Sequence, residues 1–181
     1  ARLGEAFSKL RVGPAIADLN LGPLIRATQK QRVQGFLADA QAAGIATVAQ
    51  GVVVSDAPES GFYQAPVLLR DVPVDHRVAQ EEVFGPVVAI IAVQDDAGAI
   101  GLANQSAYGL GAAVFTQDIE RAKRLAHQLE CGACFINDFV KSDPRLPFGG
   151  IKRSGYGREM SAIGIREFVN VKTIYVGADG C

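Results

Sequence analysis

The residues with the clearest chemical potential form a short stretch with two adjacent carboxylates and one aromatic ring, Gln80-Glu81-Glu82-Val83-Phe84-Gly85-Pro86. Glu82 and Phe84 alternate across Val83, so in an extended chain they would face the same side. A carboxylate accepts hydrogen bonds from two sugar hydroxyls, and a phenyl ring packs against a flat heterocycle. The pair predicts a site for a ribose and its base. The alternative is an ordinary solvated end before a strand.

A second stretch, Leu146–Glu159, is rich in glycine and ends in Arg-Glu. The two stretches carry the patterns Glu-x-Phe-Gly-Pro-Val (82–87) and Pro-Phe-Gly-Gly-x-Lys-x-Ser-Gly-x-Gly-Arg-Glu (147–159). In this order they resemble the NAD(P)-dependent aldehyde dehydrogenase superfamily. The resemblance covers the whole chain, which is similar to the last part of the family's sequence.

The resemblance implies roles for individual side chains. Glu82 would bind the nicotinamide ribose hydroxyls, and Phe84 would limit the swing of the nicotinamide ring. Phe148 would line the substrate tunnel, or be a core residue beside a tight glycine turn. Glu159 would be a candidate proton relay or, equally, a carboxylate favoured at a helix N-terminus. The implied cofactor is NAD or NADP, and the adenosine ribose site that chooses between them lies outside this chain.

The stretch Phe139–Pro147 is similar to the succinate-semialdehyde dehydrogenase subgroup. In that subgroup a serine at this place helps to hold the far carboxylate of the substrate, which makes Ser142 the candidate substrate-binding residue. The alternatives are a loop serine that caps a turn and a different small substrate, such as an aliphatic or betaine aldehyde.

By resemblance, the reaction passes through a cysteine thiohemiacetal, hydride transfer to nicotinamide and hydrolysis of a thioester by a glutamate-activated water. The nucleophile and the general base would precede this chain. The chain starts at Ala1 and its only methionine is Met160, so we expect a fragment that is inactive alone. The alternative from another class is a non-catalytic structural or interaction module of the same fold.

Composition sets broad limits on the type of protein. The 181 residues carry a formal net charge of −1, with 49% hydrophobic and 20% charged residues. These values are typical of a globular protein and favour neither a nucleic-acid nor a membrane partner. No apolar run is long enough to span a bilayer. The small number of cysteines favours a reducing, cytoplasmic setting.

The three cysteines, Cys131, Cys134 and Cys181, are not in the context of the family's nucleophile. Cys131-x-x-Cys134 follows a predicted helix rather than preceding one, so we expect buried, unreactive thiols. A zinc site would need two further ligands at suitable spacing, and the sequence has only two histidines, so no metal site is expected.

Hydrophobic periodicity predicts an α/β fold with a doubly wound, mostly parallel sheet. We expect Thr28 to cap a helix that ends at Gly44, Asp95 or Asp96 and Asp118 to cap two later helices, Pro66 to mark an edge or bulge, and a strand at 87–93 buried on both faces. Helices are expected at 1–11, 29–43, 78–82, 95–104, 118–129 and 159–167, and strands at 46–50, 62–69, 87–93, 108–115, 133–137 and 168–176. Residues 1–167 would be the C-terminal part of a catalytic domain. Residues 168–181 would be an oligomerisation strand and tail, giving a homodimer or homotetramer.

Overall fold

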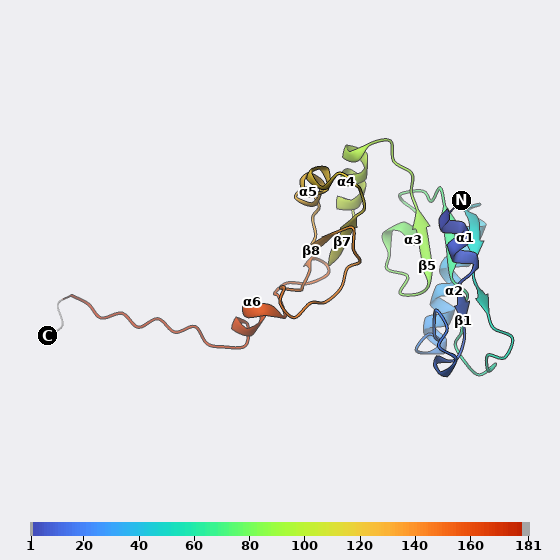
Figure 1. Cartoon of the computed structure of the whole chain (residues 1–181), viewed down its shortest axis with the longest axis horizontal. Helices are drawn as coiled ribbons and strands as arrows, with labels where there is room; N and C mark the ends of the chain where they lie inside the picture. Colours follow the sequence, from blue (N-terminus) through green and yellow to red (C-terminus); the bar gives the residue numbers. More distant parts are fainter. Residues whose placement is uncertain (1, 179–181) are drawn as a thin grey trace. The chain divides into compact units, whose positions relative to one another are not determined.

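The computed structural model describes residues 2–178 and divides into two compact units, Ala1–Val93 and Gln94–Cys181 (Figure 1). Each unit contains its own helices and at least one pair of parallel strands. The predicted α/β class is therefore confirmed. Among the described residues, no helix has the length and the apolar character needed to cross a bilayer.

Unit 1 is built around a three-stranded sheet in the order β2-β4-β5. Strand β4 pairs parallel with β5 and antiparallel with β2. A separate parallel pair joins β1 to β3. The elements of this unit are α1 (Arg2–Ser8), β1 (Arg11–Val12), a 3-10 turn η1 (Ala15–Ala17), α2 (Ala27–Ala42), β2 (Ala46–Gln50), β3 (Val52–Val53), β4 (Val67–Arg70), α3 (Arg77–Gln80) and β5 (Val87–Ile90).

The central strand β4 is buried on both of its faces because each face meets a different helix. Val67 and Leu69 join the core cluster formed with α2. Leu68, which points the other way along the strand, lines a hollow with Leu3 of α1 and Val48 of β2. Helices thus cover both faces of the sheet, as a doubly wound fold requires.

Helix α2 supplies the largest side chain of this core. Val33, Phe36 and Ala40 recur at helical spacing and are almost completely buried. The helix is followed by Gly44 with φ of 73°, a left-handed conformation that glycine adopts without steric cost. The predicted cap Thr28 is wrong: the N-cap is Arg26, without a side-chain hydrogen bond, so Thr28 lies within the first turn.

Two expectations about the neighbouring strands are also wrong. Strand β4 begins after Pro66 and is central rather than at an edge, so the missing N–H of proline lies outside the ladder. The Pro66 carbonyl accepts a 2.9 Å hydrogen bond from the Gly51 N–H. Strand β5 lies at the edge of the sheet and is only half-buried, with Val88 42% exposed, because β4 is its single neighbour here.

Unit 2 contains a parallel pair, β7 and β8, against which α5 packs, and a short antiparallel pair, β6 and β9. Two of its helices begin at the predicted caps: Asp95 accepts from the Gly98 N–H at 2.8 Å and Asp118 from the Arg121 N–H at 2.9 Å. The elements are α4 (Asp96–Asn104), β6 (Tyr108–Gly109), β7 (Gly111–Val114), α5 (Ile119–Ala126), β8 (Ala133–Ile136), β9 (Ile151–Lys152) and α6 (Ser161–Arg166).

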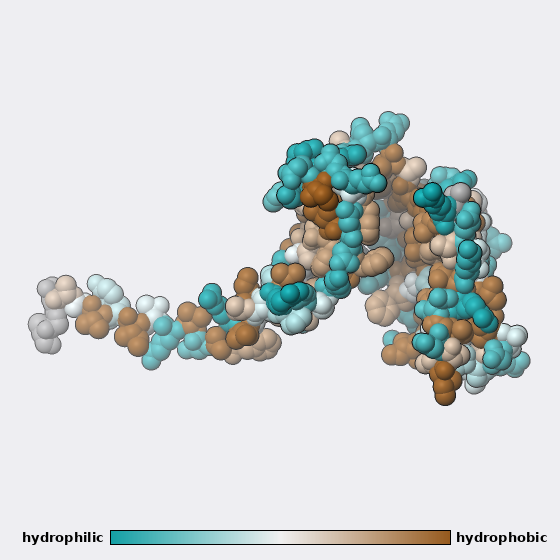
Figure 2. Space-filling model, in the orientation of Figure 1, coloured by the Kyte–Doolittle hydropathy of each residue, from teal (hydrophilic) through white to brown (hydrophobic). Residues whose placement is uncertain are grey.

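The predicted final strand at 168–176 is not a strand in this structure. These residues form an extended trace after α6 (Figure 1), and their apolar side chains are exposed, as the brown residues along it show (Figure 2). A strand is defined by hydrogen bonds to a neighbour, and no other segment within residues 2–178 pairs with this one. The last part of the predicted tail, 179–181, lies outside the described residues.

Candidate functional site

The turn that follows α3 presents Glu82 and Phe84 outward. Val83 between them is buried in the core of unit 1, whereas the Phe84 side chain is 69% exposed and Glu82 is exposed as well. The predicted alternation therefore holds, with the middle residue inward. The backbone is not extended throughout, because Phe84 has φ of 54°, a left-handed conformation that is uncommon for an aromatic residue.

The two adjacent carboxylates have different environments. The Glu81 carboxylate forms an ion pair with Arg77, whose Nε lies 3.3 Å from Glu81 Oε1. The Nη2 atom of Arg32 lies 3.6 Å from Glu81 Oε2. The Glu82 carboxylate takes part in no ion pair or hydrogen bond among the residues that the structure describes. Glu82 therefore keeps its acceptor capacity for the hydroxyl groups of a ligand. An exposed ring two residues away completes a surface that fits a ribose and a flat base.

Helix α2 holds this turn through hydrogen bonds to its backbone. The Gln29 amide Nε2 donates to the carbonyls of Val83 at 3.1 Å and Phe84 at 2.7 Å. The Arg32 guanidinium donates to the Glu82 carbonyl at 2.9 Å. Neither of these two residues was predicted from the sequence. Their spacing could have indicated them. Each lies four positions before a buried residue of the same helix, and side chains four positions apart share one helix face.

A second set of contacts joins α2 to α3 around Phe36. The guanidinium carbons of Arg77 and Arg32 lie 4.1 and 4.8 Å from the centre of the Phe36 ring, within the range of cation–π attraction. Arg77 also pairs with Asp39 at 2.5 Å. The helix that buries the core of unit 1 is thereby linked to the segment immediately before Glu82.

In unit 2, the structure brings Phe148 and Glu159 together. Their backbones form an antiparallel bridge, in which the Phe148 N–H donates to the Glu159 carbonyl at 2.8 Å and the Glu159 N–H donates back at 2.7 Å. Phe148 lines two neighbouring pockets of about 470 and 420 Å³, and Glu159 lines the second of them. An aromatic wall and a carboxylate-bearing residue thus adjoin one pocket.

The glycine-rich loop between these two residues is braced by its own backbone. The Arg158 guanidinium donates to the carbonyls of Gly150 at 2.8 Å and Gly157 at 2.7 Å, rather than to the carboxylate of its neighbour Glu159. The Gly149 carbonyl approaches Gly132 so closely that no Cβ could fit there. The motif's small residues therefore permit contacts between backbone segments that larger residues would prevent.

The motif lysine has a structural position. Lys152 has φ of 54°, and its Nζ donates to the carbonyls of Asn104 at 2.7 Å and Ser106 at 3.1 Å. It also pairs with Glu130 at 2.7 Å. These contacts fix the loop to the end of α4 and to the turn before β8.

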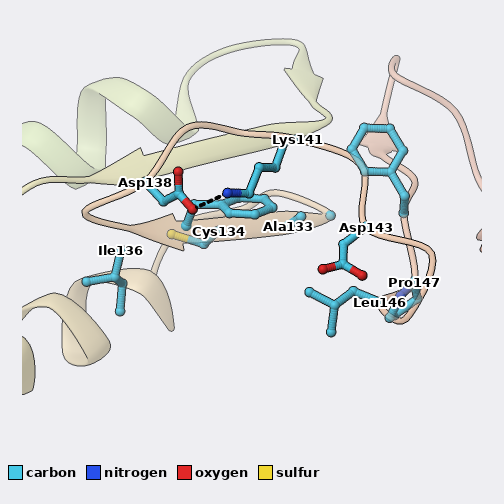
Figure 3. Close-up of a pocket in the computed structure, with 11 residues that line it drawn as sticks. Ala133, Cys134, Ile136, Asp138, Lys141, Asp143, Leu146 and Pro147 are labelled. Carbon is cyan, nitrogen blue, oxygen red and sulfur yellow. Dashed lines mark hydrogen bonds and ion pairs between the residues drawn. The ribbon is translucent and has the colours of Figure 1, made fainter. Parts of the chain in front are cut away.

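The loop that carries Ser142 runs beside the larger pocket (Figure 3). Ser142 itself is exposed and does not line the pocket, whereas its neighbours Lys141 and Asp143 do. Lys141 is paired with Asp138 at 2.5 Å, as the dashed line in Figure 3 marks. Neither pocket-lining neighbour was predicted as a site residue, and the role of Ser142 stays a prediction.

Asp143 closes the turn directly after Ser142. Its carboxylate accepts two hydrogen bonds from the Arg145 guanidinium, at 2.9 and 2.6 Å, and a third from the Arg145 backbone N–H at 2.9 Å. These interactions hold the pKa of the Asp143 carboxyl well below its usual range. The turn is therefore fixed by a charged pair at neutral pH.

The Cys-x-x-Cys segment lies next to the same pocket. Cys131 and Cys134 are half-buried free thiols, and Cys134 lines the pocket from strand β8. Burial, with a smaller effect of neighbouring Cys131, raises the pKa of Cys134 and so disfavours its reactive thiolate. The expectation of buried thiols is therefore wrong, since both are half-buried, and their lack of reactivity stays a prediction. Cys181 lies outside the described residues.

Comparison with known proteins shows what the chain is similar to. Residues 1–174 match the aldehyde dehydrogenase family. A succinate-semialdehyde dehydrogenase [NADP(+)] from Deinococcus radiodurans is 43% identical over 176 residues, which are 96% of this chain and 36% of the relative. A 4-trimethylaminobutyraldehyde dehydrogenase from Rattus norvegicus is 38% identical over 188 residues, with 96% of this chain and 38% of the relative covered.

Solved structures give the same result. A crystal structure from Burkholderia cenocepacia, assigned to the aldehyde dehydrogenases, has a TM-score of 0.93 at 55% identity and covers 96% of this chain and 37% of its own. Betaine aldehyde dehydrogenase from Staphylococcus aureus, crystallised with NAD+, has a TM-score of 0.86 at 34% identity, with 92% of this chain and 33% of its own covered. The chain thus spans about a third of the length of these relatives.

Proposed function

Because the chain belongs to the aldehyde dehydrogenase family, we propose that it is part of an enzyme that oxidises a small aldehyde with NAD or NADP. The observation that carries the proposal is the turn of unit 1, where an unpaired carboxylate, Glu82, and an exposed ring, Phe84, flank a buried residue. The relatives support both coenzymes, since one is named for NADP(+) and another was crystallised with NAD+.

In this proposal Glu82 accepts hydrogen bonds from the ribose hydroxyls next to the nicotinamide, and Phe84 limits the positions that the ring can take. The bound coenzyme supplies a hydride acceptor. Phe148 excludes water from the acyl group until hydrolysis, and Glu159 relays a proton through water to the general base. The contribution of these residues is positioning, which converts a loose encounter into a reactive geometry.

The substrate that we propose is succinate semialdehyde. Three curated relatives at 40–43% identity are named succinate-semialdehyde dehydrogenase [NADP(+)]. In this proposal the Ser142 hydroxyl contributes a hydrogen bond to the substrate's far carboxylate. A relative named for 4-trimethylaminobutyraldehyde is 38% identical, and its substrate ends in a cation instead. Specificity constants of the complete polypeptide for an anionic and a cationic aldehyde of equal length separate the two classes, and preference for the cationic one contradicts the proposal.

The coenzyme role is tested by Glu82→Gln in the complete polypeptide. Losing a charged acceptor should raise the KM for the preferred coenzyme about 10- to 100-fold, since hydrogen bonds to charged groups contribute roughly 1.5–3 kcal/mol. Glu59→Gln, an exposed glutamate that forms no ion pair in the described residues, is the matched control. Equal KM values for the two variants would overturn the assignment of Glu82. We expect the 181-residue chain alone to turn over no aldehyde, because the nucleophile is proposed to lie outside it.

We also propose that residues 168–181 form a segment distinct from residues 1–167 and mediate self-association as a homodimer or homotetramer. Val171, Ile174 and Val176 are each at least 80% exposed, and an extended apolar segment with free backbone groups invites pairing with another copy. Sedimentation of the chain truncated after Arg166 tests this. An unchanged sedimentation coefficient distribution, apart from the lost mass, contradicts it.

A further inference from the structure

We propose that Gln29 and Arg32 of α2 are positioning residues that fix the backbone of the 82–84 turn and so set the directions of the Glu82 carboxylate and the Phe84 ring. The inference rests on the proposed coenzyme role of those two side chains. Its structural part, that α2 fixes the turn, rests on the contacts described above and can be tested separately.

Gln29 acts where the backbone of the turn is strained. Phe84 has φ of 54°, and a residue in this region keeps its conformation only when the surroundings over-determine it. The Gln29 amide donates to the carbonyls of Val83 and Phe84, at 3.1 and 2.7 Å. These two carbonyls stand on either side of the strained φ angle. An amide NH₂ has two hydrogens, one for each carbonyl.

Arg32 separates the two neighbouring carboxylates. Its guanidinium donates to the Glu82 carbonyl at 2.9 Å, lies 3.6 Å from the Glu81 carboxylate, and stacks over the Phe36 ring. One planar group therefore attracts the side chain of Glu81 towards α2 while it binds only the backbone of Glu82. The Glu82 side chain is left directed to solvent, as its exposure shows.

Close packing fixes the distance between α2 and the turn. A Cβ at Gly85 would overlap the side chain of Val33, so the turn approaches the helix as far as a glycine permits. Gln29, Arg32, Val33 and Phe36 follow the spacing of one helix face. The turn can therefore change its direction only together with α2.

The structural part is tested by fluorescence in the 181-residue chain. The chain contains no tryptophan and four tyrosines, so Phe84→Trp introduces a single tryptophan at the position in question, which can be excited selectively at the red edge of its absorption. In this background Gln29→Glu keeps the shape of the side chain but replaces the donor by a carboxylate facing two carbonyls. Time-resolved anisotropy should show roughly a doubling of the amplitude of nanosecond motion at position 84. Gln34→Glu, an exposed glutamine of the same helix, adds the same charge and should leave the amplitude unchanged.

The functional part is tested in the complete polypeptide. Gln29→Glu should raise the coenzyme KM roughly three- to tenfold, the effect of about one hydrogen bond, and leave the aldehyde KM unchanged. Arg32→Ala should raise the coenzyme KM to a similar extent. Arg32→Lys keeps a charged donor, so its increase in the logarithm of the coenzyme KM should be at most half of that for Arg32→Ala. A general loss of folding would instead change both KM values and the melting temperature.

The two tests separate the inference from the function on which it rests. Equal anisotropy for Gln29→Glu and Gln34→Glu overturns the inference, and so does an unchanged coenzyme KM when Glu82→Gln raises it. If Glu82→Gln itself leaves the coenzyme KM unchanged, the proposed function fails, and the anisotropy result alone then decides whether α2 fixes the turn.

Discussion

The 81–86 turn of unit 1 and the 146–159 loop of unit 2 both present an aromatic ring and a carboxylate, but they are supported in opposite ways. The turn depends on side chains of α2, which lie 50 to 55 residues earlier in the chain. The loop supports itself: Phe148 and Glu159 bridge each other, and Arg158 binds carbonyls within the same motif.

The difference explains why the two motifs differ in length and composition. A loop that supports itself must contain its own glycines and its own donors, so its pattern is long. A turn that is supported from elsewhere needs only the residues that it presents and a glycine where the helix approaches. The short motif therefore contains fewer of the residues that fix its own conformation than the long motif does.

The strongest test of this contrast is Phe36→Ala, which removes the core residue beneath the turn. Phe36 is completely buried, and such truncations cost about 3–5 kcal/mol. Urea denaturation should show this loss, and hydrogen exchange should rise in peptides covering 81–86 more than in those covering 146–159. Phe139→Ala, at a side chain 76% exposed, should cost at most about 1 kcal/mol. Equal changes of exchange in both regions would contradict separate support.

Gly132→Ala tests the self-supporting loop. The new methyl group would overlap the Gly149 carbonyl, a backbone atom that cannot move aside without shifting the loop. We expect a loss of roughly 1–3 kcal/mol in the free energy of unfolding, with the larger rise in exchange now at 146–159. Gly101→Ala in helix α4, where nothing lies near the new methyl group, should instead stabilise the protein by about 0.5–1 kcal/mol.

Arg158→Leu makes a finer distinction within the loop. It removes the donor shared by two carbonyls and should cost about 1–3 kcal/mol if they remain without partners. Thermal denaturation measures the loss. Arg153→Leu, at an exposed arginine of the same loop whose guanidinium lies 5.7 Å from the centre of the Tyr108 ring, is the control and should lose at most about 1 kcal/mol. If the two variants melt at the same temperature, the bracing role of Arg158 is wrong.

The smallest expected effect is a pH dependence at Asp143. Its folded-state pKa is lowered by Arg145, so its contribution to stability is complete above the ordinary carboxyl pKa of about 4 and is lost as the pH falls through the folded-state pKa. The difference in urea midpoint between the parent and Asp143→Asn should thus be largest near pH 7 and shrink on acidification below about pH 4. A difference that grows on acidification would show the opposite sign of linkage.

Local patterns predicted most elements of this fold and fewer of its contacts. The caps Asp95 and Asp118 and the buried face of α2 follow from short-range chemistry that the sequence displays directly. Thr28 misled because a good capping residue was present two residues after the true N-cap, Arg26. The predicted strand at 168–176 has the right alternation, but strand formation depends on a neighbour, and a periodic pattern contains no information about whether one is present.

The candidate site shows the same limit. Glu81 is paired and Glu82 is not, because Arg77 and Arg32 lie near the Glu81 carboxylate. The motif alone could not predict the distances from these two arginines to each carboxylate. The bridge between Phe148 and Glu159 depends on how the intervening loop folds back. Residue types and alternation were predictable, whereas the assignment of each charge to its partner required the tertiary structure.

The four-residue helix α3 has a consequence for engineering. It places Arg77 and Glu81 one helical turn apart, which decides which of two consecutive carboxylates is neutralised and which one remains available. Deleting a single residue between them would place Glu82 four positions after Arg77 and so exchange these fates, whereas an insertion would move both carboxylates away from that position. Libraries over 77–84 can therefore vary residue identity, but they should conserve length.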